Sequence, residues 1–350
     1  MTRVDIKGMR ILITGHTGFV GSWLTLSLLN KGAEIAGFSL DPPTNPSLYY
    51  ILGLKDEIQD YRGNICNIKA LRCAENEFKP EVVIHLAAQP IVKSSYERPL
   101  ETFYTNIIGT ANINEIVKES LNVESLIVFT SDKVYRNDET HTLFTEIYKL
   151  GGYDPYSASK SCADIITNSY RRNIIGTKSK AISTIRAGNI IGGGDWGKYR
   201  LITDLVRSIT HKEKLKLRNP TSVRPWQHVL DVINGLIKLI DFTLSDPDKY
   251  SEDYNFGPYP YLEFTVEDFI HMFGKFWEVP IIELIENDLN ESKFLGLDSS
   301  KAHEKVGWQT FLQFPDSIKL TTDWYKAFLN EEDMKSFSLA QLKNYEDKFA

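Results

Sequence analysis

The sequence predicts an α/β fold, in which a doubly wound parallel sheet of the Rossmann type is joined to a smaller, interleaved C-terminal domain. Three observations predict it: short apolar segments alternate with helical ones, a glycine-rich turn follows the first apolar segment, and polar residues follow a later one. Since 42% of the 350 residues are hydrophobic and 25% are charged, the chain can bury a large core.

The expected strands are short runs rich in Ile and Val between turn residues. In chain order they cover residues 9–14, 34–40, 81–86, 124–130 and 180–186. Because longer helical stretches separate them, beginning with a helix over 19–30, the strands are expected to pair in parallel. After a glycine-rich loop at 192–195, helices are expected to resume near Leu201 and Leu230.

The glycine-rich turn reads Gly15-His16-Thr17-Gly18-Phe19-Val20-Gly21 and joins the first strand to the first helix. Glycines allow a tight turn and bring the backbone close to a pyrophosphate, whose charge meets the helix N-terminus. Asp41, about 20 residues after Gly21, is placed to bind an adenosine ribose. The pattern predicts a dinucleotide site. The alternatives are a glycine turn without a ligand and an ordinary turn aspartate.

Two further segments carry groups suited to acid–base chemistry. Ser131, Asp132 and Lys133 follow the fourth expected strand, at the sheet edge that faces the ligand crevice. Tyr156 and Lys160 are four residues apart, which in a helix places phenol and ammonium on one face. A phenol titrates near ~10 and a nearby cation favours its anion, so we expect this pair to supply a base at neutral pH. The alternatives are polar strand ends and a solvated helix face.

The composition of the chain excludes several classes of binding partner. The net charge of -6 lacks the basic excess of a nucleic-acid binder, so a small-molecule partner is expected and no nucleic acid. The 3 cysteines, Cys66, Cys73 and Cys162, have neither metal-ligand spacing nor the even count of a disulfide framework, so we expect structural thiols and no metal. Residues 1–7 are charged unlike a signal peptide, and no run reaches the ~18 apolar residues of a membrane span. We therefore expect a cytoplasmic protein without a membrane partner.

The ordered set of motifs resembles the extended short-chain dehydrogenase/reductases that act on nucleotide sugars. GxxGxxG, the His-Leu-Ala-Ala string at 85–88, Asn106, Ser-Asp-x and YxxxK stand in that family's order. Ser131-Asp132-Lys133 resembles the dehydratases that take CDP-glucose, because the thymidine-linked ones have Thr-Asp-Glu. The longer similar strings are 15–19 with 21–24, 40–44, 85–90, 154–160, 186–189 with 192–196, and 219–220 with 223–229.

The resemblance implies which residues hold the ligands. We expect a NAD-binding domain over 1–188, to which 228–255 also contributes, and a mainly nucleotide-sugar-binding domain over 189–350. The residues implied for NAD are Gly15, Thr17, Gly18, Phe19, Gly21, Asp41, Asn64, Ile65, Leu86, Ala87, Ala88, Asn106, Tyr156 and Lys160. Those implied for the substrate are Asn189, Arg200, Arg224 and His228, although His228 could instead cap a helix. Val20 and Asn64 replace a lysine and an aspartate of many relatives, which bears on the affinity for NAD.

The implied reaction is the dehydration of CDP-D-glucose to CDP-4-dehydro-6-deoxy-D-glucose, which feeds deoxysugar and O-antigen synthesis. NAD takes a hydride from C4 and returns it to C6, so no net oxidation results. By resemblance, the catalytic residues are Ser131, Asp132, Lys133, Tyr156 and Lys160. Tyr156 takes the O4 proton, to which Ser131 is also bonded, and Lys160 holds the nicotinamide ribose. Lys133 removes the C5 proton and Asp132 protonates the leaving C6 hydroxyl.

Other interpretations remain open on the residues alone. Another NDP-sugar 4,6-dehydratase shares every motif, and an NDP-sugar epimerase or oxidoreductase shares NAD and YxxxK without needing Asp132 and Lys133. A non-catalytic NAD sensor would be expected to lose Tyr156 or Lys160.

The family also implies a homodimer in which two helices of each subunit, here 101–118 and 156–171, pack together. Ile107, Ile113, Ile116 and Val117 fit one helical stripe for that interface, although the stripe could face the sheet instead.

Overall fold

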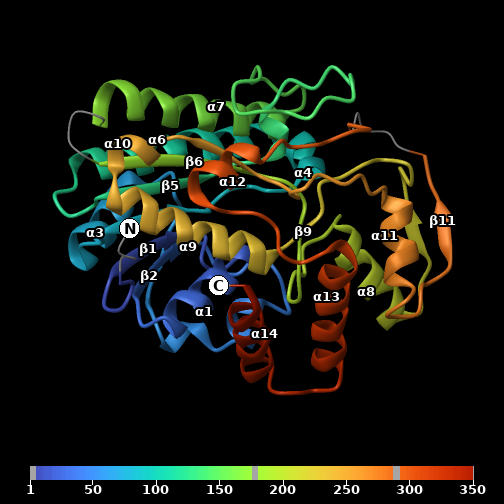
Figure 1. Ribbon diagram of the computed structural model, residues 1–350. Coiled ribbons are helices and arrows are strands. Elements are labelled where there is room, and N and C mark those ends of the chain that lie inside the picture. The colour runs from blue at the N-terminus through green and yellow to red at the C-terminus, as the bar shows by residue number, and fades with distance from the viewer. Residues whose placement is uncertain (1–4, 176–179, 287–291, 350) are drawn as a thin grey trace.

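The computed structural model describes residues 5–175, 180–286 and 292–349. Its centre is a seven-stranded parallel sheet in the order β10-β6-β5-β4-β1-β2-β3, which confirms the predicted doubly wound fold (Figure 1). The strands of this sheet are β1 (Arg10–Thr14), β2 (Glu34–Ser39), β3 (Gln59–Arg62), β4 (Val82–His85), β5 (Ser125–Phe129), β6 (Ala181–Ala187) and β10 (Asp253–Phe256).

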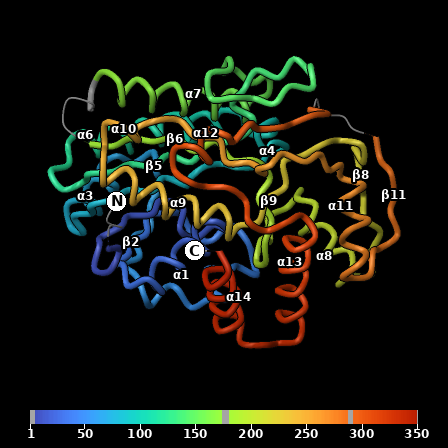
Figure 2. Tube along the Cα trace, viewed as in Figure 1, coloured from blue at the N-terminus to red at the C-terminus, as the bar shows by residue number. Residues whose placement is uncertain are grey.

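Helices connect the strands and continue beyond the sheet (Figure 2). They are α1 (Phe19–Asn30), α2 (Leu48–Ile51), α3 (Ile68–Phe78), α4 (Val92–Glu97), α5 (Pro99–Phe103), α6 (Gly109–Glu119), α7 (Pro155–Tyr170), α8 (Leu201–His211), α9 (Val229–Ser245), α10 (Pro247–Tyr250), α11 (Val266–Phe273), α12 (Ser300–Val306), α13 (Phe314–Leu329) and α14 (Met334–Phe349). Single helical turns are η1 (Leu54–Asp56), η2 (Tyr104–Ile108), η3 (Asp132–Val134) and η4 (Arg171–Ile175).

Two clusters of buried apolar side chains cover the two faces of the sheet. Trp23 of α1 and Leu236 of α9 belong to the cluster on one face. The cluster on the other face contains Ile113, Ile116 and Val117 of α6, and α7 lies beside α6 (Figure 1). Three of the four residues of the stripe expected at a dimer interface therefore pack against this chain's own sheet, because their side chains are at most 2% exposed, whereas Ile107 is half-buried and lies outside this cluster.

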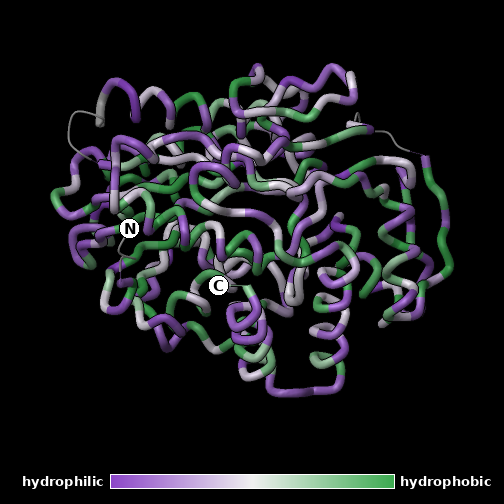
Figure 3. Tube along the Cα trace, viewed as in Figure 1, coloured by the Kyte–Doolittle hydropathy of each residue, from purple (hydrophilic) through white to green (hydrophobic). Residues whose placement is uncertain are grey.

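A smaller unit lies beside the carboxyl ends of the strands. It contains α8, α11 and the pair β8 (Leu215–Leu217) and β11 (Ile282–Leu284), whose outer strand is largely coloured as hydrophobic in Figure 3. A second pair joins β7 (Ile190–Ile191) to β9 (Gln227–His228). The hairpin of α13 and α14 packs back onto the first half of the chain, where α14 contacts α1 (Figure 1). Of the helices that the structure describes, none has the length and apolar character that crossing a membrane requires.

The five predicted strands are present, and two strands of the main sheet were missed. β3 lies at the edge of the sheet and reads Gln-Asp-Tyr-Arg, so it lacks the apolar pattern on which the prediction depended. β10 has only four residues and follows two consecutive helices. It pairs with β6 at the opposite edge, and α9 leads back to it from the smaller unit.

A buried ion-pair network ties α7 to the sheet. Arg186 of β6 donates to both carboxylate oxygens of Asp164 on α7, from Nε at 2.8 Å and from Nη2 at 2.6 Å. Asp253 of β10 lies 3.2 Å from the same guanidinium, and Nη1 donates to the Tyr135 hydroxyl at 2.9 Å. Arg186 and Asp164 are 1% and 0% exposed, so their charges depend on each other rather than on water.

We predict that Arg186→Met lowers the free energy of unfolding by about 3–5 kcal/mol, because it leaves Asp164 buried without its cation. Denaturant titration measures the change. The control is Glu119→Gln, which breaks an exposed pair with Arg72 and should cost less than about 1 kcal/mol. Equal losses in the two variants would show that the buried network contributes no more to the free energy of unfolding than an exposed ion pair does.

Candidate active site

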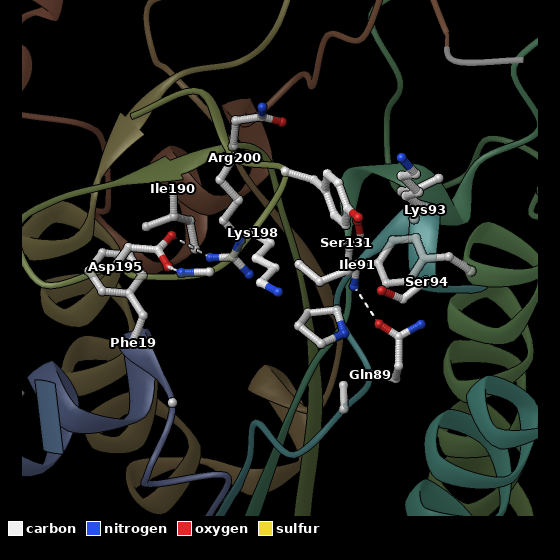
Figure 4. Close-up of a pocket in the computed structure, with 18 of the residues that line it drawn as sticks. Phe19, Gln89, Ile91, Lys93, Ser94, Ser131, Ile190, Asp195, Lys198 and Arg200 are labelled. Atoms are coloured by element: carbon white, nitrogen blue, oxygen red, sulfur yellow. Dashed lines mark hydrogen bonds and ion pairs between the residues drawn. The ribbon is translucent and has the colours of Figure 1, made fainter. Parts of the chain in front are cut away.

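One large cavity, of about 1620 Å³, opens where the chain leaves the carboxyl ends of β1, β4, β5 and β6. β1 and β4 are neighbours in the sheet but not in sequence, so the cavity lies at the point where the strand order reverses. Figure 4 shows side chains from several elements pointing into it, among them Phe19 of α1, Ser131 after β5, and Arg200 before α8. The site is therefore built from both units of the chain.

The backbone of the glycine turn lies close to the connection that follows β4. Gly15 has φ +78°, and a Cβ there would lie 2.7 Å from the Ala87 nitrogen. A Cβ on Gly21 would overlap the Gly15 carbonyl oxygen. Gly18 differs, since an added Cβ meets only that oxygen at 3.4 Å, and Gly18 is the N-cap of α1 at the cavity wall. Gly15 and Gly21 thus have no room for a side chain, whereas Gly18 leaves open space beside the helix N-terminus.

Two side chains of the turn itself, Thr17 and His16, hold it against β2 and β3. Thr17 Oγ1 lies 2.8 Å from Ser39 Oγ and donates to the Leu40 carbonyl at 3.2 Å, just before Asp41 on the cavity wall. The His16 ring lies under β2 and its Nε2 is 3.0 Å from Asp60 Oδ1. Burial lowers the pKa of His16 to about 4, so the ring is neutral at pH 7. No pattern in the sequence singles out Asp60, because it lies on β3, the strand that was missed.

Ser131, Asp132 and Lys133 form a connected cluster at the end of β5. Ser131 Oγ donates to Asp132 Oδ1 at 2.9 Å, and Lys133 Nζ donates to the same oxygen at 2.9 Å. The Asp132 side chain is 2% exposed, and its Oδ2 has no hydrogen-bond partner among the described residues. A carboxylate with one buried, uncommitted oxygen next to an amine suits proton transfer to a ligand in the cavity.

Tyr156 and Lys160 lie on one face of α7 and both line the cavity, as the spacing predicted. Burial raises the pKa of Tyr156 to about 12, although a hydrogen bond with Ser131 and the charge of Arg200 lower it. The expectation of a phenol with a lowered pKa is therefore wrong for this structure, since burial outweighs the hydrogen bond with Ser131 and the charge of Arg200, and Lys160 is not among the main causes of the shift. Lys160 Nζ donates to the Phe129 carbonyl at 3.3 Å, and burial lowers its pKa to about 8.

The expected substrate residues divide into two groups. Asn189, Arg200 and Arg224 line the cavity, and Arg200 is held by Asp195 with Nη1 2.6 Å from Oδ2. His228 is fully buried behind the wall that the described residues form, where its Nδ1 accepts from the Leu230 N–H at 3.3 Å. Of the two roles expected for His228, the structure gives it that of the α9 N-cap, because β9 leads directly into this helix.

The remaining expected cofactor residues also lie at the cavity, with one exception. Those on its wall include Phe19, Asn64, Ile65, Leu86, Ala87 and Ala88. Asn106 lies behind the wall that the described residues form, where it accepts from the Gln89 N–H at 2.8 Å and donates to Ser159 Oγ at 2.8 Å. Asn106 thereby links Gln89, in the connection after β4, to Ser159 on α7, and so it supports the cavity wall without lining it.

Comparison with known proteins identifies the family. The family model described as "NAD dependent epimerase/dehydratase family" matches residues 11–257. The chain belongs to this family. It is 40% identical to the CDP-glucose 4,6-dehydratase of Salmonella typhimurium over 346 residues, which cover 97% of this chain and 96% of the relative.

Solved structures of family members share the fold. One is UDP-glucuronic acid 4-epimerase from Bacillus cereus in complex with UDP-glucuronic acid and NAD, with TM-score 0.79, 21% identity, and coverage of 91% of this chain and 100% of that one. Another is dTDP-glucose 4,6-dehydratase from Bacillus anthracis in complex with NAD, with TM-score 0.74, 26% identity, and coverage of 91% and 97%.

Some cavity residues in this family member were not found from the sequence. Lys93 of α4 places its Nζ 4.5 Å from the centre of the Tyr199 ring, joining α4 to the loop before α8. Tyr199 has φ +63°, a conformation that no sequence pattern around it signals. Asp195 stood in a string noted for its resemblance, but its bond to Arg200 joins residues whose contact depends on the loop's path.

We predict that Lys160 makes stability rise at alkaline pH. Its folded pKa of about 8 lies below the value of 10.5 for a free lysine, so the unfolded chain binds more protons between those values. The free energy of unfolding of the wild type, relative to Lys160→Met, should therefore increase by up to about 3 kcal/mol as pH rises from 8 to 10.5. Denaturant titrations across this range test it, and parallel curves for both proteins would contradict it.

Proposed function

We propose that the protein is a NAD-dependent hydro-lyase that converts CDP-D-glucose to CDP-4-dehydro-6-deoxy-D-glucose and water. The observation that carries this proposal is the Ser131-Asp132-Lys133 cluster, which faces the same cavity as Tyr156 and Lys160. Epimerisation or simple oxidation at C4 needs a base for O4 but no second acid–base pair. The high identity to a CDP-glucose 4,6-dehydratase over nearly the whole chain supports the choice of substrate.

The cavity fits NAD at its glycine turn. The open space beside Gly18, at the N-terminus of the twelve-residue helix α1, suits a pyrophosphate. The residues that would hold NAD are Gly15, Thr17, Gly18, Phe19, Gly21, Asp41, Asn64, Ile65, Leu86, Ala87, Ala88, Tyr156 and Lys160. When bound, NAD supplies hydride acceptance and return, which makes the C5 proton acidic between the two transfers.

Tyr156 acts as the base for the sugar O4 hydroxyl in this proposal. Its high pKa means that the phenol must lose its proton as the substrate binds or reacts, which Ser131 favours through a hydrogen bond and Arg200 through its positive charge. Lys160 lies one helical turn away, and its amine is poised between its charged and neutral forms near pH 8. Ser131 forms a hydrogen bond with the Tyr156 phenol and so keeps the phenol oriented.

Elimination requires an acid and a base, and Asp132 and Lys133 supply both after one proton transfer. Lys133 Nζ donates a hydrogen bond to Asp132 Oδ1 at 2.9 Å. Moving that proton onto the carboxylate leaves a neutral amine, which takes the C5 proton, and a carboxylic acid, which protonates the departing C6 hydroxyl. The ion pair at rest therefore holds the one proton that the step needs.

The test uses purified protein with NAD and CDP-glucose, beside UDP-glucose and dTDP-glucose. We predict that CDP-glucose reacts fastest and that mass spectrometry detects a product that has lost water. Asp132→Asn should lower turnover by about 10²-fold or more, since an amide cannot supply the proton. The control, Asp138→Asn, alters an exposed carboxylate of the same connection and should leave turnover unchanged. A 4-epimer as the product, or full activity of Asp132→Asn, would contradict the proposal.

We also propose a homodimer, with an interface different from the expected stripe. Leu100, Tyr104, Ile108 and Ile165 are 68%, 55%, 43% and 53% exposed. The first three are four residues apart along α5 and η2, so they share one helical face, and α7, which carries Ile165, packs beside them. This face suits a second copy of the chain, because two such helices per subunit build a four-helix contact.

The dimer is tested by light scattering at micromolar concentration. The double variant Ile108→Asp with Ile165→Asp should be monomeric, because two charges per subunit would be buried without partners. The control is Leu121→Asp, which changes a 98% exposed leucine beyond the end of α6 and should leave the dimer intact. A wild-type protein that scatters as a monomer would remove this proposal.

We also propose a cytoplasmic location, which agrees with the free thiols of Cys66, Cys73 and Cys162. The proposed product would feed deoxysugar synthesis.

A further inference from the structure

We propose that Asp195 is a positioning residue, which holds the Arg200 guanidinium where it binds the substrate diphosphate, and that Tyr325 of the C-terminal hairpin holds Asp195. This inference rests on the proposed function, since it takes Arg200 as a diphosphate ligand. It adds a carboxylate and a hydroxyl that do not touch the substrate. In Figure 4, Asp195 and Arg200 point toward each other at the cavity.

Asp195 is held on several sides. Its Oδ1 accepts from the Gly197 N–H at 3.0 Å, and its Oδ2 accepts from Arg200 Nη1 at 2.6 Å. Its main-chain oxygen accepts from the Tyr325 hydroxyl at 2.5 Å and from Thr203 Oγ1 at 3.0 Å. The Asp195 side chain is only 10% exposed. A carboxylate fixed in this way can hold a guanidinium in one place, which a mobile surface residue cannot.

The loop before Asp195 is held at Gly193 between α1 and α13, and we call this contact the clamp around Gly193. Trp23 of α1 donates from Nε1 to the Gly193 carbonyl at 2.9 Å. Trp324 of α13 packs against Gly193 so closely that an added Cβ would overlap its ring. Because Trp324 and Tyr325 are adjacent and both fully buried, α13 contributes the ring against Gly193 and the hydroxyl on Asp195. The loop therefore has little freedom to take Asp195 elsewhere.

The arginine follows a path that needs this support. A Cβ on Gly197 would lie 3.3 Å from Arg200 Nε, so the side chain passes closely over the turn. The charge of Asp195 is the largest cause of the raised pKa of Arg200, and the guanidinium in turn lowers the pKa of Tyr156. Arg200 Nε and Nη2 have no hydrogen-bond partner within the described part of the chain. They are thus available to phosphate oxygens near the reacting sugar.

An opposite role for Asp195 makes a different prediction. If the carboxylate mainly neutralised Arg200 and competed with phosphate, its removal would strengthen diphosphate binding. If it positions Arg200, its removal weakens binding, because the freed guanidinium must be ordered again when the ligand binds. The direction of the change in affinity separates the two.

The experiment measures CDP binding by isothermal titration calorimetry, with UDP and dTDP beside it, on the purified full chain. Asp195→Asn should weaken CDP binding about 10-fold, and Tyr325→Phe should weaken it several-fold. In the Arg200→Met background, Asp195→Asn should have no further effect, because the residue acts through Arg200. The KM for CDP-glucose should rise with the CDP affinity loss, while the melting temperature and the bound NAD stay as in the wild type. The control is Asp323→Asn, an exposed carboxylate on α13 paired with Lys319.

The outcomes separate this inference from the proposed function. Unchanged or tighter CDP binding by Asp195→Asn would overturn the inference and leave the proposed function standing. The same loss in both backgrounds would overturn it too, since a purely structural role does not depend on Arg200. Failure of the wild type to bind any of the three diphosphates would contradict both.

Discussion

The buried pair of Arg186 and Asp164 is the interaction on which the geometry of the candidate site depends. It links β6 to α7, the helix that carries Tyr156 and Lys160. Through the Tyr135 hydroxyl, the same guanidinium also reaches the segment that carries Asp132 and Lys133. Two groups of reactive side chains that are distant in sequence thereby share one anchor. A charge with no access to water tolerates little displacement of its partners, so both groups keep a fixed separation.

Burial of the side chains in the site shifts their pKa values and makes their charged forms less favourable. It raises the pKa of Tyr156 and lowers that of Lys160, and it withdraws Asp132 from solvent. Each shift disfavours the charged form of the residue, so the charges of the ligands and of Arg200 matter more here than they would in water. A site of this kind is weakly reactive until its ligands arrive, which suits a reaction whose intermediates must be kept from water.

Much of the fold and part of the site followed from the sequence, because their signals are local. A glycine turn between a strand and a helix, and a tyrosine four residues before a lysine, are visible in short windows. What the sequence missed, or left open between two alternatives, depends on contacts between distant segments. The polar edge strand β3 forms by pairing with β2, and His228 caps a helix because β9 leads straight into it. The stripe of Ile113, Ile116 and Val117 has the same period whether it faces a partner or the sheet, and burial decides between them.

The clamp around Gly193 has a consequence for how the protein is made. Trp23 leaves the ribosome early, whereas Trp324 and Tyr325 leave it near the end, after the whole of the main sheet. A nascent chain can close its glycine turn over β1 and α1 while the loop that carries Asp195 still lacks half of its walls. The loop that carries Asp195 can therefore reach its final contacts only after α13 has been made. Loss of α13 would take the Trp324 ring and the Tyr325 hydroxyl away from the loop that carries Asp195, and it would also take apolar side chains away from the core on one face of the sheet.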